Sequence, residues 1–367
     1  MGRVVVVGAG IVGSLHALIA HDRGHDVVHI EREATTRGAS VRNFGLLWVS
    51  GRQAGPELAL ALRARAGWDR VAARIPAVGL RPDGSLTLAR DDLELKLLVE
   101  AGNLADADAR GFRLLDPAEA RELNPAIATD VCGALWCQRD GIVEPRLAAR
   151  AIVDYLRAQS RYQWLSRREI VDVADHRVVD HDGSVHEADI AVICTGAWHT
   201  GVAARGLHGI PVRRVRLQML QTFPFPVRLT TSIADIDALR YYPAYAELPV
   251  ALLPPQPAVA QRAHAQLLIV QRQDGSLTIG DTHEYDEPFG FDVQEAVYTH
   301  LLERAGQLLG RPLPPVRSRW AGVYSQVTDD RLYIREQLAD GVVLVTGLGG
   351  RGMTCAPTVA AETFGWT

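Results

Sequence analysis

The feature that most constrains the fold is a pair of glycine-rich turns, one near each end of the chain. Residues 3–7 (RVVVV) are a strand-like run that leads directly into residues 8–13 (GAGIVG). Residues 341–346 form a second apolar run, which continues into residues 347–353 (GLGGRGM). A buried strand that opens through a glycine turn into a helix is the form that holds a dinucleotide pyrophosphate. The second turn also lets backbone approach something flat or charged, which predicts a flavin held from two ends of the chain.

The residues around the first turn favour a nucleotide-binding βαβ unit. The valines of residues 3–7 are typical of a parallel strand buried on both faces, and residues 25–30 predict a second strand. Glu31 ends that strand 18 positions after Gly13. An acid near the usual spacing of ~20 residues binds a ribose 2′-hydroxyl, so FAD or NAD fits and NADP does not. The alternative is a βαβ unit that binds no ligand.

Length and composition bound the class of protein. A chain of 367 residues is long for one core, so two domains are expected, and 47% hydrophobic with 22% charged residues is typical of a soluble globule. The net charge of −4 gives no reason to expect nucleic acid or an anionic membrane as a partner. No apolar run approaches the ~18 residues of a membrane span, and a core strand at the N-terminus leaves no room for a signal peptide, so we expect a cytoplasmic protein. No residue spacing predicts a metal site, and the four cysteines, without a CxxC pair, are expected to be buried thiols.

The remaining patterns predict a second domain within the first. Helices are predicted at residues 56–73, 91–103 and 144–158, and buried strands at 86–89 and 190–194. Much of residues 211–315 instead alternates as in an antiparallel sheet, with Asp274-Gly275 as a hairpin turn. The predicted class is α/β (α+β overall), a Rossmann-like FAD-binding domain with an inserted, mainly antiparallel substrate-binding sheet. We assign residues 1–85, 143–212 and 316–367 to the FAD-binding domain, and residues 86–142 and 213–315 to the substrate-binding domain.

Three motifs together resemble those of a known family. Residues 8–13, residues 194–198 (CTGAW) and residues 347–353 are similar to the FAD-dependent D-amino acid oxidase superfamily, on its glycine oxidase and sarcosine oxidase side. This resemblance covers essentially the whole chain. A finer resemblance, to a bacterial subgroup associated with aminophosphonate breakdown, rests on short motifs at residues 39–45, 215–219 and 278–285.

The resemblance implies where FAD would bind, without a covalent bond. The first turn would hold the pyrophosphate, Glu31 the adenosine ribose, and Ile170 would touch adenine. Ser40 and Asn43 would line the loop that passes the pyrophosphate and flavin. Residues 349–354 would face the flavin ring near N1 and O2, where a helix N-terminus stabilises negative charge. The predicted cofactor-binding residues are Gly8, Gly10, Gly13, Glu31, Arg32, Ser40, Arg42, Asn43, Ile170, Thr195, Gly196, Trp198, Gly347, Gly349, Gly350, Arg351, Gly352, Met353 and Thr354.

The chain also departs from the family it resembles. The position where amino acid oxidases carry an arginine for the substrate carboxylate corresponds here to Tyr324, and a phenol does not replace a bidentate guanidinium. Sarcosine oxidases attach their flavin to a cysteine, and no cysteine lies between Cys194 and Cys355, so non-covalent FAD is expected. Their oxygen-activating lysine corresponds to Thr278, which argues against fast turnover with oxygen.

An anionic substrate group would need cationic partners. Arg42 and Arg351 are the candidates beside the flavin, because two guanidinium forks suit the three oxygens of a phosphonate. Alternatively, Arg42 pairs with the FAD pyrophosphate and Arg351 with a carboxylate. The other predicted pocket residues are Tyr324, Tyr242, Tyr245 and His283, for the last three of which the alternative is a packing or surface role.

The resulting hypothesis is FAD-dependent oxidation of a small primary or secondary amine. A neutral amine would give a hydride to flavin N5, and the imine would hydrolyse to a carbonyl, with no obligate general base. The expected substrate is an aminophosphonate, a 2-aminoethylphosphonate derivative, and O2 or another acceptor would reoxidise the flavin. The alternatives are an oxidase for glycine, sarcosine or D-amino acids, and a flavin-binding subunit that transfers electrons within a complex. The sequence leaves the oligomeric state open.

Overall fold

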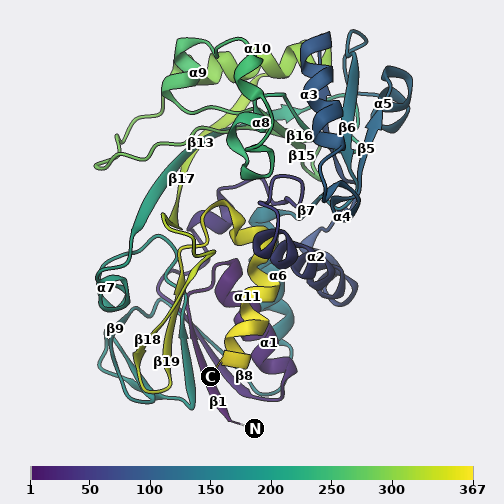
Figure 1. Ribbon diagram of the computed structural model, residues 1–367. Coiled ribbons are helices and arrows are strands. Elements are labelled where there is room, and N and C mark those ends of the chain that lie inside the picture. The colour runs from purple at the N-terminus through teal and green to yellow at the C-terminus, as the bar shows by residue number, and fades with distance from the viewer. Residues whose placement is uncertain (1, 367) are drawn as a thin grey trace.

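The computed structural model describes residues 2–366 and is built around two sheets (Figure 1). The six-stranded sheet lies in the lower half of the view, near both chain ends, and the eight-stranded sheet lies in the upper half. Strands β13 (Val212–Pro224) and β17 (Val316–Val327) extend from the upper sheet toward the lower one. In residues 2–366 no helix has the length and apolar character needed to cross a membrane.

The six-stranded sheet carries both glycine turns at its strand ends. Its neighbouring strands pair in parallel, except that β18 (Ile334–Ala339) runs antiparallel to β19 (Val342–Thr346). Residues Val4, Val5 and Val6 of the central strand are fully buried, which is why the valine run shows no alternation. In spatial order the strands are β18 (Ile334–Ala339), β19 (Val342–Thr346), β12 (Ile190–Ile193), β1 (Arg3–Val7), β2 (Asp26–Glu31) and β8 (Tyr162–Ser166).

Both faces of this sheet are covered. On one face, the alternate valines Val4 and Val6 pack against residues of four helices in one hydrophobic cluster. On the other face, Val5 and Val7 pack against a small sheet and a short helix. The helices are α1 (Ile11–Asp22), α2 (Pro56–Arg74), α6 (Pro145–Arg157) and α11 (Gly352–Trp366), and the opposite elements are α7 (Val202–Leu207), β9 (Ile170–Ala174), β10 (Arg177–Asp180) and β11 (Val185–Glu187).

The eight-stranded sheet is antiparallel except for one parallel pair, β14 (Ser232–Ala234) with β4 (Ser85–Ala89). Helix α10 (Glu295–Leu309) covers it through Tyr298 and Leu301, which share a buried cluster with Ile279. A second helix, α3 (Asp92–Gly102), packs against the last three strands at the other end of this sheet (Figure 1). In spatial order the strands are β17, β13, β16 (Ser276–Gly280), β15 (Leu268–Gln271), β14 (Ser232–Ala234), β4 (Ser85–Ala89), β6 (Gly133–Cys137) and β5 (Phe112–Leu115).

Short elements complete the fold. The pair formed by β3 and β7 fixes the loop that follows the first nucleotide-binding unit. The remaining elements are η1 (Ala39–Val41), β3 (Leu46–Leu47), η2 (Pro76–Val78), α4 (Ala107–Arg110), α5 (Pro117–Leu123), β7 (Gly141–Ile142), α8 (Ala238–Tyr241), η3 (Pro243–Tyr245), η4 (Val250–Leu252), α9 (Ala258–Arg262) and η5 (Gly349–Arg351).

The predicted fold class is confirmed, and one boundary needs correction. The hairpin between β15 and β16 turns at Asp274-Gly275, where Gly275 has a φ of +80°. Residues 316–327, which we assigned to the FAD-binding domain, form β17 and pair with β13 along nearly its whole length, from Val212–Val327 to Thr222–Val316. Helix α10 was not predicted. The wider division into two discontinuous domains stays a prediction.

Stability below neutral pH should depend on a histidine in strand β2. His29 is fully buried between the hydroxyl of Tyr162 and the carbonyl of Gly8, and this burial lowers its pKa to about 4. An unfolded histidine titrates near ~6.5, so between those values the unfolded chain binds the extra proton. The contribution of His29 to the free energy of unfolding is fully present above pH ~6.5. It falls by about 3 kcal/mol as the pH drops to about 4.

Urea unfolding at pH 7.5 and pH 4.5 measures this loss of unfolding free energy. We expect His29→Gln to lose less stability than wild type across that interval, because glutamine does not titrate. A matched change at the exposed His208 should leave the pH dependence as in wild type. Equal slopes for His29→Gln and wild type would show that His29 does not carry the effect.

Candidate functional site

A cavity of about 820 Å³ connects the two glycine turns with the eight-stranded sheet. One part is lined by Gly8, residues 10–13, Glu31 and residues 194–198, at the ends of β1, β2 and β12. Another part is lined by β13, β17 and the segment after β16. Ligands of open parallel sheets bind at such strand ends, and here the cavity continues into the second sheet.

The first turn can contain only glycine at two positions. Gly8 has a φ of +96°, and a Cβ on it would lie 2.3 Å from the carbonyl oxygen of Cys194. A Cβ on Gly13 would lie 1.8 Å from the carbonyl oxygen of Gly8. The glycines therefore let β1 pass into α1 with the backbone itself forming the cavity wall, as pyrophosphate binding requires.

Polar groups around this turn fit an adenosine diphosphate moiety. The Glu31 carboxylate lines the cavity and accepts hydrogen bonds from the backbone N–H groups of Ala9 at 2.7 Å and Glu33 at 3.0 Å, which fix its orientation. The Thr195 hydroxyl is buried with no partner among the described residues. Arg32 lies over the ring of Trp198, 4.1 Å from its centre, at the rim of the same region.

The second turn forms the opposite wall. Gly347 and Gly349 have φ values of +75° and +61°, so the chain reverses sharply between β19 and α11. A Cβ on Gly350 would meet no atom within 4 Å, which leaves space beside this backbone on the cavity side. FAD fits these features: the Glu31 carboxylate, the Thr195 hydroxyl without a partner, and the open space beside Gly350. Its flavin would lie against the second turn.

Most predicted residues line the cavity, but two do not. The Thr354 hydroxyl hydrogen-bonds the backbone of Trp48 and Leu46, so its side chain faces β3 instead of the cavity. Tyr245 is buried in a hydrophobic cluster, with its ring stacked on Phe112 at 6.5 Å. Tyr245 therefore has a packing role, which corrects its prediction. The Thr354 side chain packs against β3, and the predicted role of the helix N-terminus at this residue stays a prediction. All the other predicted cofactor-binding and substrate-binding residues are among those that line the cavity.

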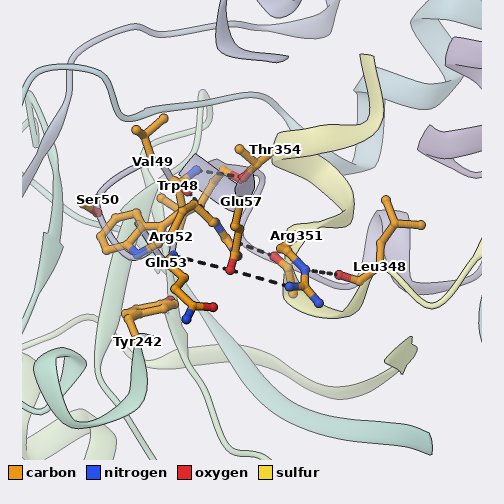
Figure 2. Close-up of polar contacts among 12 residues, drawn as sticks. Trp48, Val49, Ser50, Arg52, Gln53, Glu57, Tyr242, Leu348, Arg351 and Thr354 are labelled. Carbon is orange, nitrogen blue, oxygen red and sulfur yellow. Dashed lines mark hydrogen bonds and ion pairs between the residues drawn. The ribbon is translucent and has the colours of Figure 1, made fainter. Parts of the chain in front are cut away.

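Two arginines beside the second turn, the buried Arg52 and the partly buried Arg351, share one carboxylate (Figure 2). Glu57, in the first turn of α2, lies 3.4 Å from Arg52 Nη1 and 3.6 Å from Arg351 Nη1. Arg52 also donates to the carbonyl oxygens of Trp48 and Gly350, and Arg351 donates to that of Leu348. Although burial opposes it, Glu57 raises the pKa of Arg52, whereas burial lowers the pKa of Arg351. The cluster has two guanidinium groups and one carboxylate, and so an excess positive charge.

The loop that carries Arg52 is fixed by a buried aspartate. Asp140 accepts from the backbone N–H groups of Val49 at 2.5 Å and Ser50 at 3.0 Å, and from two serine hydroxyls. Arg110 donates to the carbonyl oxygens of the same two residues. Arg42, the other predicted arginine, is exposed and donates to the carbonyl oxygens of Arg37 and Ala321.

A second polar group lines the part of the cavity formed by the eight-stranded sheet. Asp281 and His283 follow β16, and Gln266 precedes β15. Tyr324 on β17 and Tyr242 after α8 line the same region. The sequence identified His283 and both tyrosines, but not Asp281, Gln266 or Arg52.

The comparisons with known proteins agree with this geometry. The chain is 27% identical over 244 residues to a glycine oxidase of Geobacillus kaustophilus, a match that covers 63% of this chain and 64% of that relative. It is 32% identical over 159 residues to one component of the anaerobic glycerol-3-phosphate dehydrogenase of Escherichia coli, covering 41% of this chain and 28% of the relative. The matched segments thus span less than two thirds of each relative's length.

Solved structures show the same fold over nearly the whole chain. The glycine oxidase structure from Geobacillus kaustophilus has a TM-score of 0.77 at 23% identity, covering 98% of this chain and 93% of that one. An iminodiacetate oxidase from Chelativorans has a TM-score of 0.77 at 19% identity, covering 99% and 94%. The family described as "FAD dependent oxidoreductase" matches residues 3–366. The chain therefore belongs to the FAD-dependent oxidoreductase family.

Proposed function

We propose that this enzyme oxidises a small amine that carries an anionic group, as a glycine oxidase-type member of its family. The observation that carries the proposal is the excess positive charge of the cluster formed by Arg52, Glu57 and Arg351, which lines the cavity at the second glycine turn. A carboxylate or phosphonate would supply the missing negative charge. The similarity to a glycine oxidase supports the amine as the group oxidised.

The side chains would act mainly by positioning the substrate. FAD, when bound, accepts the hydride that the amine's α carbon gives up. Arg351 and Arg52 would hold the anionic group, while Tyr242 and Tyr324 would limit the access of water around the reacting carbon. Burial raises the pKa of both tyrosines, so both would act as neutral phenols.

The similarity to glycine oxidases favours glycine, sarcosine or a D-amino acid as the substrate. An aminophosphonate is the second candidate, because Tyr324 stands where amino acid oxidases carry an arginine for the carboxylate. Two guanidinium groups at Arg52 and Arg351 also suit the three oxygens of a phosphonate. O2 or another acceptor would reoxidise the flavin in either case.

Anaerobic mixing of the FAD-loaded protein with a panel of amines tests the proposal. The panel contains glycine, sarcosine, D-alanine, 2-aminoethylphosphonate and its N-methyl and 1-hydroxy forms, and the readout is bleaching of the flavin band near ~450 nm. Bleaching by the amino acids would support the glycine oxidase-type substrate, and bleaching by phosphonates alone would support the second candidate. If no amine bleached the flavin, the proposal would be wrong and a role in electron transfer within a complex would be favoured.

Replacing Arg351 should weaken the binding of anionic substrates. In Arg351→Met, Glu57 keeps Arg52 as its partner, so the cluster loses its excess charge and becomes neutral, and the fold should stay intact. Hydrogen bonds to charged groups contribute about 1.5–3 kcal/mol, so the Kd from anaerobic bleaching should rise roughly 10- to 150-fold. Arg205→Met, which removes an exposed ion pair with Asp172, is the control. An unchanged Kd would mean that Arg351 serves only Glu57.

A further inference from the structure

We propose that Asp281, His283 and Gln266 form the subsite that binds the substrate's ammonium group. This inference rests on the proposed function, since it assigns the amine a place in the same cavity. All three side chains line the cavity, on the segment after β16 and the segment before β15. They stand on other elements than the arginine cluster, which lies at the second glycine turn, so the two ends of a zwitterion would have separate partners.

Asp281 is a buried carboxylate without a cationic partner. Its side chain is 8% exposed, and its Oδ1 accepts a hydrogen bond from Gln266 Nε2 at 3.2 Å. Within residues 2–366, no arginine or lysine forms an ion pair with Asp281. The ionisable group beside its Oδ2 is the imidazole of His283, whose Nε2 lies 3.8 Å away. Burial raises the pKa of Asp281, the response of a carboxylate that lacks a counter-charge. Burying an unpaired carboxylate lowers the stability of the fold, unless a bound cation compensates its charge.

His283 does not supply that cation. Its Nδ1 lies 3.1 Å from the carbonyl oxygen of His264, which can only accept, so Nδ1 carries the proton. Burial lowers the pKa of His283, and the ring is therefore neutral with a lone pair on Nε2. Two acceptors, His283 Nε2 and Asp281 Oδ2, thus lie 3.8 Å apart, and neither accepts a hydrogen bond from a side chain or backbone group of another residue within 2–366.

Gln266 provides a third free acceptor. Its amide nitrogen donates to Asp281 Oδ1 and, at 3.3 Å, to the hydroxyl of Tyr242. Its Oε1 is buried and has no hydrogen-bond partner among the described residues. The subsite therefore offers a carboxylate oxygen, an imidazole nitrogen and an amide oxygen as acceptors. A primary ammonium has three N–H donors and no acceptor, which matches this set.

The surrounding rings also favour a cation. The Tyr241 ring stacks on His283 with centres 4.1 Å apart, and Tyr285 stacks on the same imidazole at 6.4 Å. Tyr242 packs edge-on against Tyr241 at 5.0 Å. Aromatic faces attract ammonium groups electrostatically, and most strongly where water is excluded. An N-methylated amine would keep this interaction while giving up one hydrogen bond.

The test compares ligands that differ only by the amino group. In the FAD-loaded Asp281→Asn variant, the Kd of glycine or 2-aminoethylphosphonate, from anaerobic bleaching, should rise about 100-fold, as for the loss of a buried charge partner. The Kd of the amine-free counterpart, acetate or ethylphosphonate, read from the shift of the flavin spectrum, should stay within about threefold. Asp235→Asn, an equally buried aspartate outside the cavity lining, is the matched control and should change neither value.

Equal Kd values for the amine in wild type and Asp281→Asn would overturn the inference, and so would an equal loss for both kinds of ligand. Should Asp281→Asn fail to retain FAD, His283→Phe keeps the ring stacked on Tyr241 and removes one acceptor. It should raise the amine's Kd roughly 10-fold and leave the amine-free ligand unchanged. If no amine bleached the wild type, the proposed function would fail, while the preference for amines in the spectral titration would still test this subsite.

Discussion

Gly13→Ala is expected to yield protein that cannot retain FAD. The added Cβ would lie 1.8 Å from the carbonyl oxygen of Gly8, and backbone on both sides of this contact belongs to the turn between β1 and α1. Since the contact cannot be relieved by a side-chain rotation, α1 must move away from the strand, and the pyrophosphate cradle opens. If moving α1 costs about 3 kcal/mol of binding free energy, FAD binding becomes roughly 150-fold weaker. FAD content after gel filtration, from absorbance at ~450 nm, measures the effect.

The same substitution in a helix provides the control. Gly306 lies inside α10, and a Cβ there would approach nothing closer than 3.7 Å. Gly306→Ala should keep full FAD content and gain up to about 1 kcal/mol in stability, because alanine favours helices. Normal FAD content in Gly13→Ala would show that the turn can relax and that the cofactor is not held through it.

Glu57→Gln should cause a large loss of stability, although Glu57 lies outside the nucleotide-binding turn. Its carboxylate is 5% exposed and is the shared partner of Arg52 and Arg351 (Figure 2). Glutamine keeps the shape but leaves the charges of the buried Arg52 and the partly buried Arg351 without compensation. Breaking a buried ion pair on one side costs about 3–5 kcal/mol, and we expect a loss in this range from urea unfolding at saturating FAD.

An exposed carboxylate, Asp154, provides the control for this prediction. Asp154 pairs with Arg150 and Arg157 on the surface of α6. Asp154→Asn should cost less than about 1 kcal/mol, because water screens exposed pairs. Adding acetate or phosphonate should partly restore Glu57→Gln, since an anion in the cavity would replace the missing charge. A loss no greater than that of Asp154→Asn would mean that water already screens the arginine cluster.

The sequence predicted the parts of the site that depend on local backbone rules. Glycines with a required conformation, such as Gly8, and the acid at the end of β2, Glu31, stand at fixed spacings along the chain. FAD as the cofactor and the mixed fold class are confirmed on this basis. The two glycine turns lie side by side only because β1 and β19 flank β12 in one sheet.

The substrate side was less predictable because its groups meet through tertiary packing. Arg52 lies in a loop without periodicity, and only its burial beside Glu57 distinguishes it from a surface arginine. Asp281 and Gln266 are 15 positions apart in sequence and meet because β15 and β16 form a hairpin. Tyr245 was assigned to the pocket from residue type alone, but its ring is needed in the core against Phe112.

The placement of β19 has a consequence for how the protein is made. This strand ends at residue 346, yet it inserts beside β12, and α11 after it packs on α1. Ribosomes add about 5–20 residues per second, so roughly half a minute separates the synthesis of β1 from that of the last strand of its sheet. During that time the apolar faces of β12 and α1 have no permanent cover. FAD therefore cannot assist folding before β19 has been made, and chaperone demand should be highest before that point, with cofactor loading after it.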